Sequence, residues 1–261
     1  MKKIRLGIVG CGFLGNIIVD AWRNGLLQEY EFVGCVSRTM ESTHALAAKA
    51  GCRACTDIDD LLALKPDYVL EAASPVVMEA IAEKVLRSAS SLVVLSIGAF
   101  ADAEFYEKTL HTARETGTRV HLASGAIGGF DVLRTTALMS SIQSSITTEK
   151  GPGSLKGTPV FKESLLTDTG KTQVFFGSAK DAIALFPTKV NVAVATALAT
   201  AGTEKTSVSI HSVPGFKGDE HRIEIIGEEV RALVTIYSRT SAIAGWSVVA
   251  LLRNLVSPIV F

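Results

Sequence analysis

His221 is the side chain whose type and setting best suit proton transfer. In the stretch His221-Arg222-Ile223-Glu224-Ile225-Ile226, the two-residue period of a strand puts the imidazole on one face with Ile223 and Ile225. An imidazole titrates near neutral pH, so a histidine on that apolar side can act as a general acid or base. A core histidine whose hydrogen bonds are satisfied by its neighbours is the alternative interpretation.

A second chemical signal is the run Gly10-Cys11-Gly12-Phe13-Leu14-Gly15, which matches G-x-G-x-x-G. It follows a predicted strand and opens a predicted helix, the context in which this motif binds a dinucleotide. Gly10 permits the tight turn, Gly12 lets the backbone approach a pyrophosphate, and Gly15 lets helix and strand pack closely. Backbone N–H groups at the helix start then face the phosphates. A glycine-rich turn without a ligand is the alternative.

The end of the second predicted strand, Val36-Ser37-Arg38, bears on the choice of dinucleotide. A site that prefers NAD usually has Asp or Glu here to bond the ribose 2′-OH, and this segment has none. Arg38 can instead pair with a 2′-phosphate. We therefore expect NADP, or use of both cofactors, unless Arg38 is a solvated residue that leaves NAD usable.

Asn191 is the one strong hydrogen-bonding side chain in the stretch Val190–Ala195, where valine and alanine otherwise dominate. A buried amide needs partners. A nicotinamide carboxamide or a ribose hydroxyl is one candidate partner, and a neighbouring backbone group is the other. No His, Cys and carboxylate spacing suggests a metal site, so we expect none.

These residues have to be positioned by a first half in which strand and helix signals alternate. Strands are expected at Ile4–Val9, Glu31–Ser37, Tyr68–Ala72, Leu92–Ile97 and Val120–Ala123, with helices at 14–24, 43–50, 75–87 and 102–115. Such alternation predicts an α/β fold with a Rossmann-type, doubly wound parallel sheet and right-handed crossovers.

The glycine-rich stretch Ser124–Gly129 separates this half from one with a different pattern. Helices are expected at 131–143 and 178–201, and strands at 145–149, 160–166, 207–213, 221–226 and 231–237. We predict a dinucleotide-binding domain over residues 1–123 and an α+β substrate and oligomerisation domain over 124–240. The apolar helix expected within 241–261 would pack back on the first domain.

Composition excludes several other classes of function. Lys plus Arg and Asp plus Glu both number 26, so the formal net charge is zero and no basic cluster favours nucleic acid. The N-terminus does not resemble a secretory signal, and the apolar stretch 242–256 is short for a membrane span. The four cysteines lie within the first 55 residues, a poor layout for a disulfide framework. We expect a cytoplasmic protein with no membrane or nucleic-acid partner.

Seven short stretches carry a family resemblance. They are Gly10–Gly15, Glu71-Ala72-Ala73-Ser74, Leu95–Ala99, Ser124–Gly129, Phe186-Pro187 with Val190-Asn191-Val192, Glu220–Ile223, and Arg239-Thr240-Ser241. In this order they resemble the L-aspartate dehydrogenases over nearly the whole chain. The stretch Ser124–Gly129, with those around Asn191 and His221, is more specific than the glycine loop.

The resemblance implies oxidation of L-aspartate to iminoaspartate with NAD or NADP. The imine is hydrolysed to oxaloacetate and ammonia or passed to NAD biosynthesis, and the reverse reaction is a reductive amination. The family's dinucleotide contacts fall on Ala126 and Asn191, and its catalytic histidine falls on His221. The matched stretch after the third strand adds Ala73 and Ser74 to the expected cofactor-binding residues. His221 would take the proton from the substrate ammonium and activate the water that hydrolyses the imine.

A dicarboxylic amino acid needs cationic or N–H donors for its carboxylates. Lys171, Arg239, Thr240 and Ser241 are candidates, and a helix start at Ser241 would add N–H donors. Two positions depart from the family pattern. Ser74 stands where a glycine or other small residue is expected, and Ser238–Ser241 replaces a segment that usually has Asn-Pro before the basic residue.

Two other functions remain open on the sequence. One is a dehydrogenase or imine reductase for a related small amino or oxo acid. The other is a regulator that binds NAD(P) without turnover. We also expect a homodimer or larger assembly, because strand-rich second domains often pair through their sheets.

Overall fold

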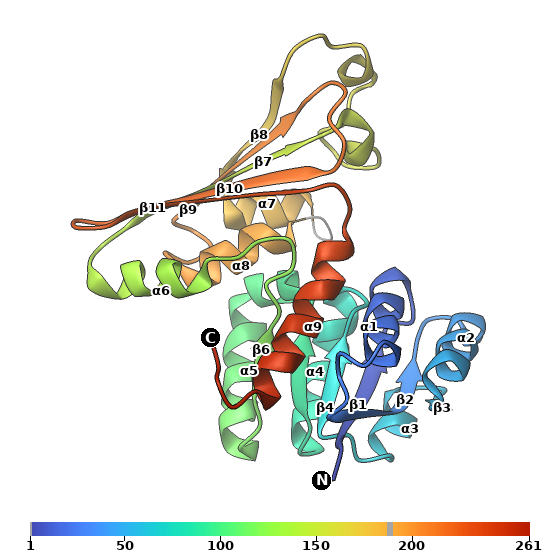
Figure 1. The fold of residues 1–261 in the computed structure, drawn as a ribbon. Coiled ribbons are helices and arrows are strands. Elements are labelled where there is room, and N and C mark those ends of the chain that lie inside the picture. Colours follow the sequence, from blue (N-terminus) through green and yellow to red (C-terminus); the bar gives the residue numbers. More distant parts are fainter. Residues whose placement is uncertain (1, 187–189) are drawn as a thin grey trace. The chain divides into compact units, whose positions relative to one another are not determined.

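The computed structural model describes residues 2–186 and 190–261, which form two compact units (Figure 1). The first unit comprises residues 1–125 and 244–261, and the second comprises residues 126–243. The chain thus leaves the first unit once and returns to it with its last helix.

The described part of the first unit is built on a six-stranded parallel sheet with the strand order β3-β2-β1-β4-β5-β6. Its strands are β1 (Ile4–Val9), β2 (Tyr30–Val36), β3 (Arg53–Ala54), β4 (Tyr68–Glu71), β5 (Ser91–Val94) and β6 (Val120–Leu122). The order reverses between β1 and β4, where doubly wound sheets bind their ligands. The Rossmann-type fold expected from the alternation is confirmed.

Helices follow these strands because each crossover in a parallel sheet needs one. They are α1 (Phe13–Arg23), α2 (Met40–Ala50), α3 (Ile58–Leu62), α4 (Pro75–Arg87) and α5 (Ala103–Thr116). Side chains cap several of them: Asp102 accepts a hydrogen bond from the backbone N–H of Phe105 at 2.8 Å, and Ser74 accepts one from Val77. Pro75 occupies the first turn of α4, where its missing N–H costs nothing.

The last helix, α9 (Ala242–Val256), completes the core of the first unit. Val248, Val249 and Leu252 are buried in the same apolar cluster as Leu6 and Ile8 of β1. The Tyr30 hydroxyl donates a hydrogen bond to the Leu252 carbonyl oxygen at 2.7 Å. Residues more than two hundred positions apart therefore share one core.

The second unit is a mixed five-stranded sheet, over its described residues, with helices on one face (Figure 1). The strand order is β11-β10-β7-β9-β8, and only the β7–β9 pair is parallel. The strands are β7 (Gln143–Lys150), β8 (Thr172–Ser178), β9 (Thr206–Ser212), β10 (Asp219–Ile226) and β11 (Arg231–Ser238). The helices are α6 (Phe130–Met139), α7 (Ala179–Leu185) and α8 (Asn191–Ala199).

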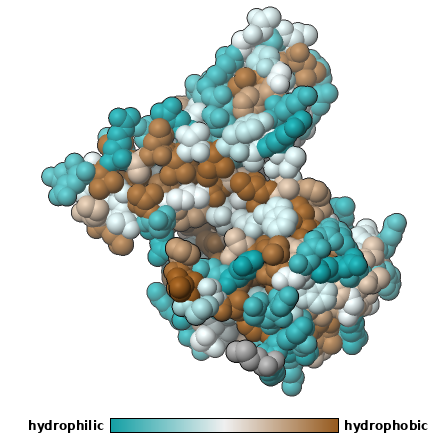
Figure 2. Space-filling view, viewed as in Figure 1, coloured by the Kyte–Doolittle hydropathy of each residue, from teal (hydrophilic) through white to brown (hydrophobic). Residues whose placement is uncertain are grey.

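The sheet of the second unit has one covered face and one open face. Buried and partly exposed residues alternate along β7 and β10, as the pleat of a strand requires. Helices α6 and α8 contact β10 and β7 on the covered face. Figure 2 shows apolar side chains in a band along this unit, where the sheet and the helices meet in Figure 1.

Several element predictions were wrong. The segment 160–166 was expected to be a strand, but Glu163–Leu166 forms a 3-10 helix. Residues Ile97–Ala101 also form a 3-10 helix, so the fourth predicted strand ends at Val94. Strands β3 and β8 were missed: β3 has two residues, and β8 carries a register shift at Gln173/Phe175. The short length of β3 and the register shift in β8 each interrupt the alternation of apolar residues by which a strand is predicted.

Candidate active site

The glycine loop has the backbone geometry that a pyrophosphate site needs. Gly10 has φ = 107°, and a Cβ there would lie 2.5 Å from the Ala72 carbonyl oxygen. A Cβ on Gly15 would overlap the carbonyl oxygen of Gly10, which explains the close packing of α1 on the loop. A Cβ on Gly12 would meet nothing within 4 Å. Gly12 therefore leaves open space at the start of α1, where free N–H groups favour an anion.

The side chains of the loop divide between the core and the surface. Cys11 is buried in the core cluster of the first unit, and Leu14 is half-buried beside it. Phe13 is 59% exposed. Ser37 and Arg38 directly follow β2, with Arg38 exposed. The positive charge of Arg38 is therefore available at the carboxyl end of the strand next to β1.

A buried carboxylate joins the two loops that follow β4 and β5. Glu71, the last residue of β4, is fully buried. Its carboxylate accepts hydrogen bonds from the backbone N–H groups of Ala73 (2.7 Å), Ser74 (3.0 Å) and Ser96 (3.0 Å), and from the Ser96 hydroxyl (2.8 Å). Burial raises the pKa of Glu71, and these donors act in the opposite direction. Ala73 and Ser74 are thus held in place, with the Ala73 backbone next to Gly10.

His221 lies on the covered face of the second unit with Ile223 and Ile225, as its strand period predicts, and is 3% exposed. Its Nδ1 atom is 2.9 Å from the Thr148 hydroxyl of β7, the residue opposite it in the register. Burial lowers the pKa of His221 to about 4. The carboxylate of Asp219 raises this pKa and the ammonium of Lys150 lowers it. The imidazole is therefore neutral at physiological pH.

Lys150 and Asp219 complete the surroundings of His221. Lys150 shares the covered face of β7 with Thr148 and is 9% exposed. Its Nζ atom lies 3.5 Å from a carboxylate oxygen of Asp219, its partner in the β7–β10 register. Neither residue was predicted from the sequence to belong to the site. Lys150 could have been predicted from the two-residue period of the strand, which places it on the same face as Ile146 and Thr148.

Asn191 and Ala126 belong to the same unit as His221. Asn191 is the first residue of α8, which packs on β7 and β9. Ala126 precedes Gly128, whose Cβ would lie 3.8 Å from Ile236, the β11 residue opposite His221. Gly128 therefore lies close to the strand next to His221. Pro187, from the matched stretch before Asn191, lies outside the described residues.

The residues expected to bind the substrate carboxylates are less closely grouped. Thr240 and Ser241 are exposed, and the Thr240 hydroxyl accepts a hydrogen bond from the N–H of Ala242, where α9 begins. Lys171 forms an ion pair with Glu149, which alternates with Thr148 and Lys150 along β7 and so lies on the opposite face of the sheet. The structure does not bring Lys171 together with His221.

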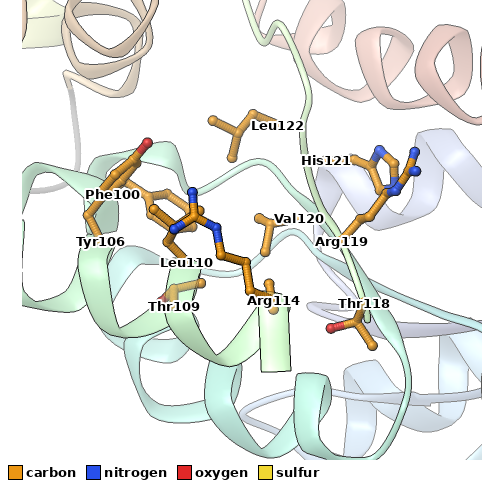
Figure 3. A pocket seen from close by; sticks show the side chains of 11 residues that line it. Phe100, Tyr106, Thr109, Leu110, Arg114, Thr118, Arg119, Val120, His121 and Leu122 are labelled. Carbon is orange, nitrogen blue, oxygen red and sulfur yellow. The ribbon is translucent and has the colours of Figure 1, made fainter. Parts of the chain in front are cut away.

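A cavity of about 470 Å³ in the first unit lies beside the edge strand β6 and helix α5 (Figure 3). Tyr106, Leu110 and Arg114 line it from the helix, and Val120 and Leu122 line it from the strand. His121 is also a lining residue, and its ring packs against Tyr68 at a centroid distance of 5.8 Å. Among its described lining residues, none is an expected site residue.

Neither a metal centre nor a membrane span is evident over the described range. No group of three or more His, Cys, Asp or Glu residues in 2–186 and 190–261 is arranged to hold a metal ion. No helix in that part of the chain is long and apolar enough to cross a membrane.

The fold and the glycine loop define the class of the protein. Residues 10–123 match the model for the NAD-binding domain of homoserine dehydrogenase. A homoserine dehydrogenase from Thiobacillus denitrificans has the same fold, with a TM-score of 0.68 over 98% of this chain and 73% of that chain, at 16% identity. The protein is an NAD(P)-dependent dehydrogenase with a Rossmann-type domain.

The chain belongs to the L-aspartate dehydrogenase family. It is 31% identical to the L-aspartate dehydrogenase of Methanocaldococcus jannaschii and 31% identical to that of Methanospirillum hungatei, each over 98% of both chains. Residues 131–255 match the C-terminal aspartate dehydrogenase model. The aspartate dehydrogenase structure from Thermotoga maritima has a TM-score of 0.79 at 27% identity and covers 99% of both chains. The family predicted from the seven stretches is confirmed.

Proposed function

We propose that this enzyme oxidises L-aspartate to iminoaspartate, which water then converts to oxaloacetate and ammonia. The first unit would hold NAD(P)⁺, which would supply the hydride acceptor for the substrate Cα. The substrate ammonium has to lose a proton for the C=N bond to form, and a water has to be activated for hydrolysis. The reverse direction is a reductive amination of oxaloacetate.

The observation that carries this proposal is the buried, neutral imidazole of His221. A neutral ring can accept the ammonium proton, whereas an imidazolium cannot. For Nε2 to accept it, Nδ1 must hold the ring hydrogen and donate it to Thr148 Oγ1 at 2.9 Å. The contact with Thr148 fixes the ring orientation, and the hydroxyl can accept the hydrogen bond that this tautomer requires. We assign His221 as the general acid and base of the reaction.

The first unit supplies the groups that would hold the dinucleotide. Open space at Gly12 and the free N–H groups at the start of α1 suit the pyrophosphate. Ala73 and Ser74, fixed by Glu71, are proposed contacts with the cofactor, as are Cys11, Phe13 and Leu14 of the loop. In the second unit we propose Ala126 and Asn191 for the nicotinamide end.

The exposed guanidinium of Arg38 supports use of NADP, or of both cofactors. A 2′-phosphate brings two negative charges to the end of β2, where Arg38 can form charge-assisted hydrogen bonds. Ser37 stands before it in place of the acid that would repel this phosphate. We propose that Arg38 gives the enzyme its NADP activity.

Thr240 and Ser241 are the proposed donors for one substrate carboxylate, because both are exposed just before α9. Lys171 is left out of the proposal. Its ammonium is already paired with Glu149, on the face of the sheet opposite His221.

The direct test is to mix the protein with L-aspartate and NAD⁺ or NADP⁺ and to follow absorbance of the reduced cofactor. Turnover of aspartate is expected with at least one cofactor. His221→Ala should lower kcat by about a hundredfold or more. Turnover of another amino or hydroxy acid without aspartate would refute the substrate. Tight dinucleotide binding with no turnover of a substrate panel would instead favour a regulator.

We further propose a homodimer that pairs through the open face of the second sheet. Leu233 (50% exposed), Phe176 (69%) and Tyr237 (53%) lie on or beside this face, and Leu233 and Tyr237 stand opposite Glu224 and Glu220 of β10. Light scattering should give twice the 27.6 kDa chain mass, and Leu233→Lys should shift it towards the monomer. Leu138→Lys, on α6, is the control, since Leu138 is 88% exposed away from this face. A monomeric wild type contradicts the proposal.

The four free thiols, Cys11, Cys35, Cys52 and Cys55, support a reducing compartment. We therefore propose that the enzyme works in the cytoplasm.

A further inference from the structure

Lys150 is a nearly buried cation on the same face of the sheet as His221. It lies two residues beyond Thr148, which contacts His221, so it is the next residue of β7 on that face. Only 9% of its surface is exposed. Its charge acts directly on the imidazole, since it lowers the pKa of His221.

The charge of Lys150 is poorly compensated for its burial. Over the described residues, its one ion-pair partner is Asp219, with 3.5 Å between the nitrogen and the oxygen. The Asp219 side chain is 39% exposed, so water competes for it. A buried ammonium costs free energy unless it is paired and hydrogen-bonded. Lys150 therefore lacks the close anionic partner that a nearly buried ammonium needs.

We infer that the Lys150 ammonium binds a carboxylate of the dicarboxylic amino acid beside His221 and so selects for an acidic substrate. This inference rests on the proposed function, because it assumes a dicarboxylate substrate. A carboxylate supplies the short, charge-assisted hydrogen bonds that the 3.5 Å contact with Asp219 lacks.

Binding at this position also has a consequence for His221. With no substrate, burial and then the Lys150 charge keep the imidazole a weak base, against the opposing effect of the Asp219 carboxylate. A bound carboxylate offsets the positive charge, which raises the pKa of His221 and makes the ring a better proton acceptor. The anionic substrate thereby improves the base that deprotonates it.

A purely structural role for Lys150, joining β7 to β10 through Asp219, makes a different prediction. If only the ion pair matters, Lys150→Met and Asp219→Asn remove the same contact and have the same effect. If Lys150 binds substrate, Lys150→Met removes the binding group, whereas Asp219→Asn releases the ammonium from its ion pair. The two variants should then change dicarboxylate affinity in opposite directions.

The test uses calorimetric titration of the dinucleotide-free protein with succinate, and with propionate as the monocarboxylate control. Lys150→Met should raise the Kd for succinate at least tenfold. This is about the effect of losing one charge-assisted hydrogen bond. Lys150→Arg should retain most of the affinity, and Asp219→Asn should bind succinate more tightly. Lys180→Met is the matched control, because Lys180 is an exposed lysine of the same unit, paired with Glu204.

Succinate binding by Lys150→Met within twofold of wild type overturns the inference, and so does equal weakening by Asp219→Asn. Should Lys150→Met fail to fold, NMR titration of His221 in the wild type decides: succinate has to raise its pKa, and an unchanged pKa refutes the inference. Failure of the proposed function is distinct, since the wild type would then not turn over aspartate. If the wild type turns over aspartate and Lys150→Met has the same KM for aspartate, the inference about Lys150 is refuted while the proposed function stands.

Discussion

Among single residues, His221 has the position and surroundings that bear most directly on the proposed chemistry. The sequence placed it on the apolar face of a strand, because strand period is a local property that a few neighbours reveal. Its neutrality could not be predicted in the same way. That depends first on burial within the folded unit, and then on the charge of Lys150 on another strand, more than seventy positions away.

The lowered pKa of His221 predicts a specific loss of stability in acid. The unfolded chain has the ordinary value of 6.5 and the folded chain about 4, so protons bind the unfolded state more readily. The contribution of His221 is complete above pH 6.5 and is lost as the pH falls towards 4. A difference of this size is worth about 3 kcal/mol. The free energy of unfolding is measured with urea at pH 7 and at pH 4. Between these pH values it should fall by about 3 kcal/mol less in His221→Leu than in the wild type.

His44→Leu serves as the control, because His44 is exposed on α2. Its pH dependence should follow that of the wild type. If His221→Leu loses as much stability in acid as the wild type does, the imidazole is not buried in its neutral form.

Arg38 carries a second residue-scale prediction. If its guanidinium binds the 2′-phosphate, Arg38→Ala should reduce kcat/KM for NADP by about 10- to 100-fold, the effect of losing a charged hydrogen bond. The value for NAD should change by less than about threefold. Arg114→Ala, an exposed arginine of α5 in the same unit, should leave both unchanged. Equal loss with both cofactors would show that Arg38 does not read the phosphate.

At the element scale, the local pattern predicted most of the first sheet but less of the second. Buried parallel strands such as β1 and β5 appear as near-continuous apolar runs, and the sequence shows both runs clearly. The short strand β3 has no such run, because pairing with β2 alone defines it. The 160–166 segment has the apolar residues of a strand, yet Glu163–Leu166 coils into a 3-10 helix.

The ends of β4 and β5 show what periodicity cannot reveal. A glutamate such as Glu71 is not expected at the end of an apolar strand, because burial of a carboxylate costs free energy. In the structure it accepts four hydrogen bonds from the loops that follow the two strands. A buried acid of this kind is tolerated only where donors surround it. The donors come from Ser96 as well as from adjacent residues, so sequence reasoning had no local signal.

Glu71→Gln should therefore loosen the loop that holds Ala73 and Ser74. An amide can accept through one oxygen only, and its NH₂ group would face a backbone N–H. The variant should lose about 1–3 kcal/mol of stability. It should raise the KM for the dinucleotide about tenfold while changing kcat less. Denaturant unfolding and initial-rate kinetics measure the two effects.

Glu79→Gln tests whether any glutamate near this loop would do the same. Glu79 is exposed on α4 and should give wild-type values in both measurements. A normal dinucleotide KM in Glu71→Gln would mean that the Ala73–Ser74 loop does not contact the cofactor.

At the scale of the whole molecule, the path of the chain links its two ends. Residues 1–125 do not contain their complete core, because Val248, Val249 and Leu252 of α9 supply part of it. A Cβ on Gly245 would lie 3.1 Å from Ile17 of α1, so the two helices are in close contact. The dinucleotide-binding unit can therefore fold completely only after the second unit has been synthesised.

Leu252→Ala tests this dependence with a single buried side chain. Leu252 is fully buried, and truncation of such a leucine costs about 2–5 kcal/mol. The loss should appear in the unfolding of the first unit, followed by Trp22 fluorescence and by the protection that added dinucleotide gives. Arg253→Ala, on the exposed side of the same helix, should cost less than about 0.5 kcal/mol. A ligand raises the stability of the unit that binds it. If added dinucleotide restores the unfolding midpoint of Leu252→Ala, Leu252 therefore belongs to the core of the first unit. Unchanged stability in Leu252→Ala would instead show that α9 is dispensable for that core.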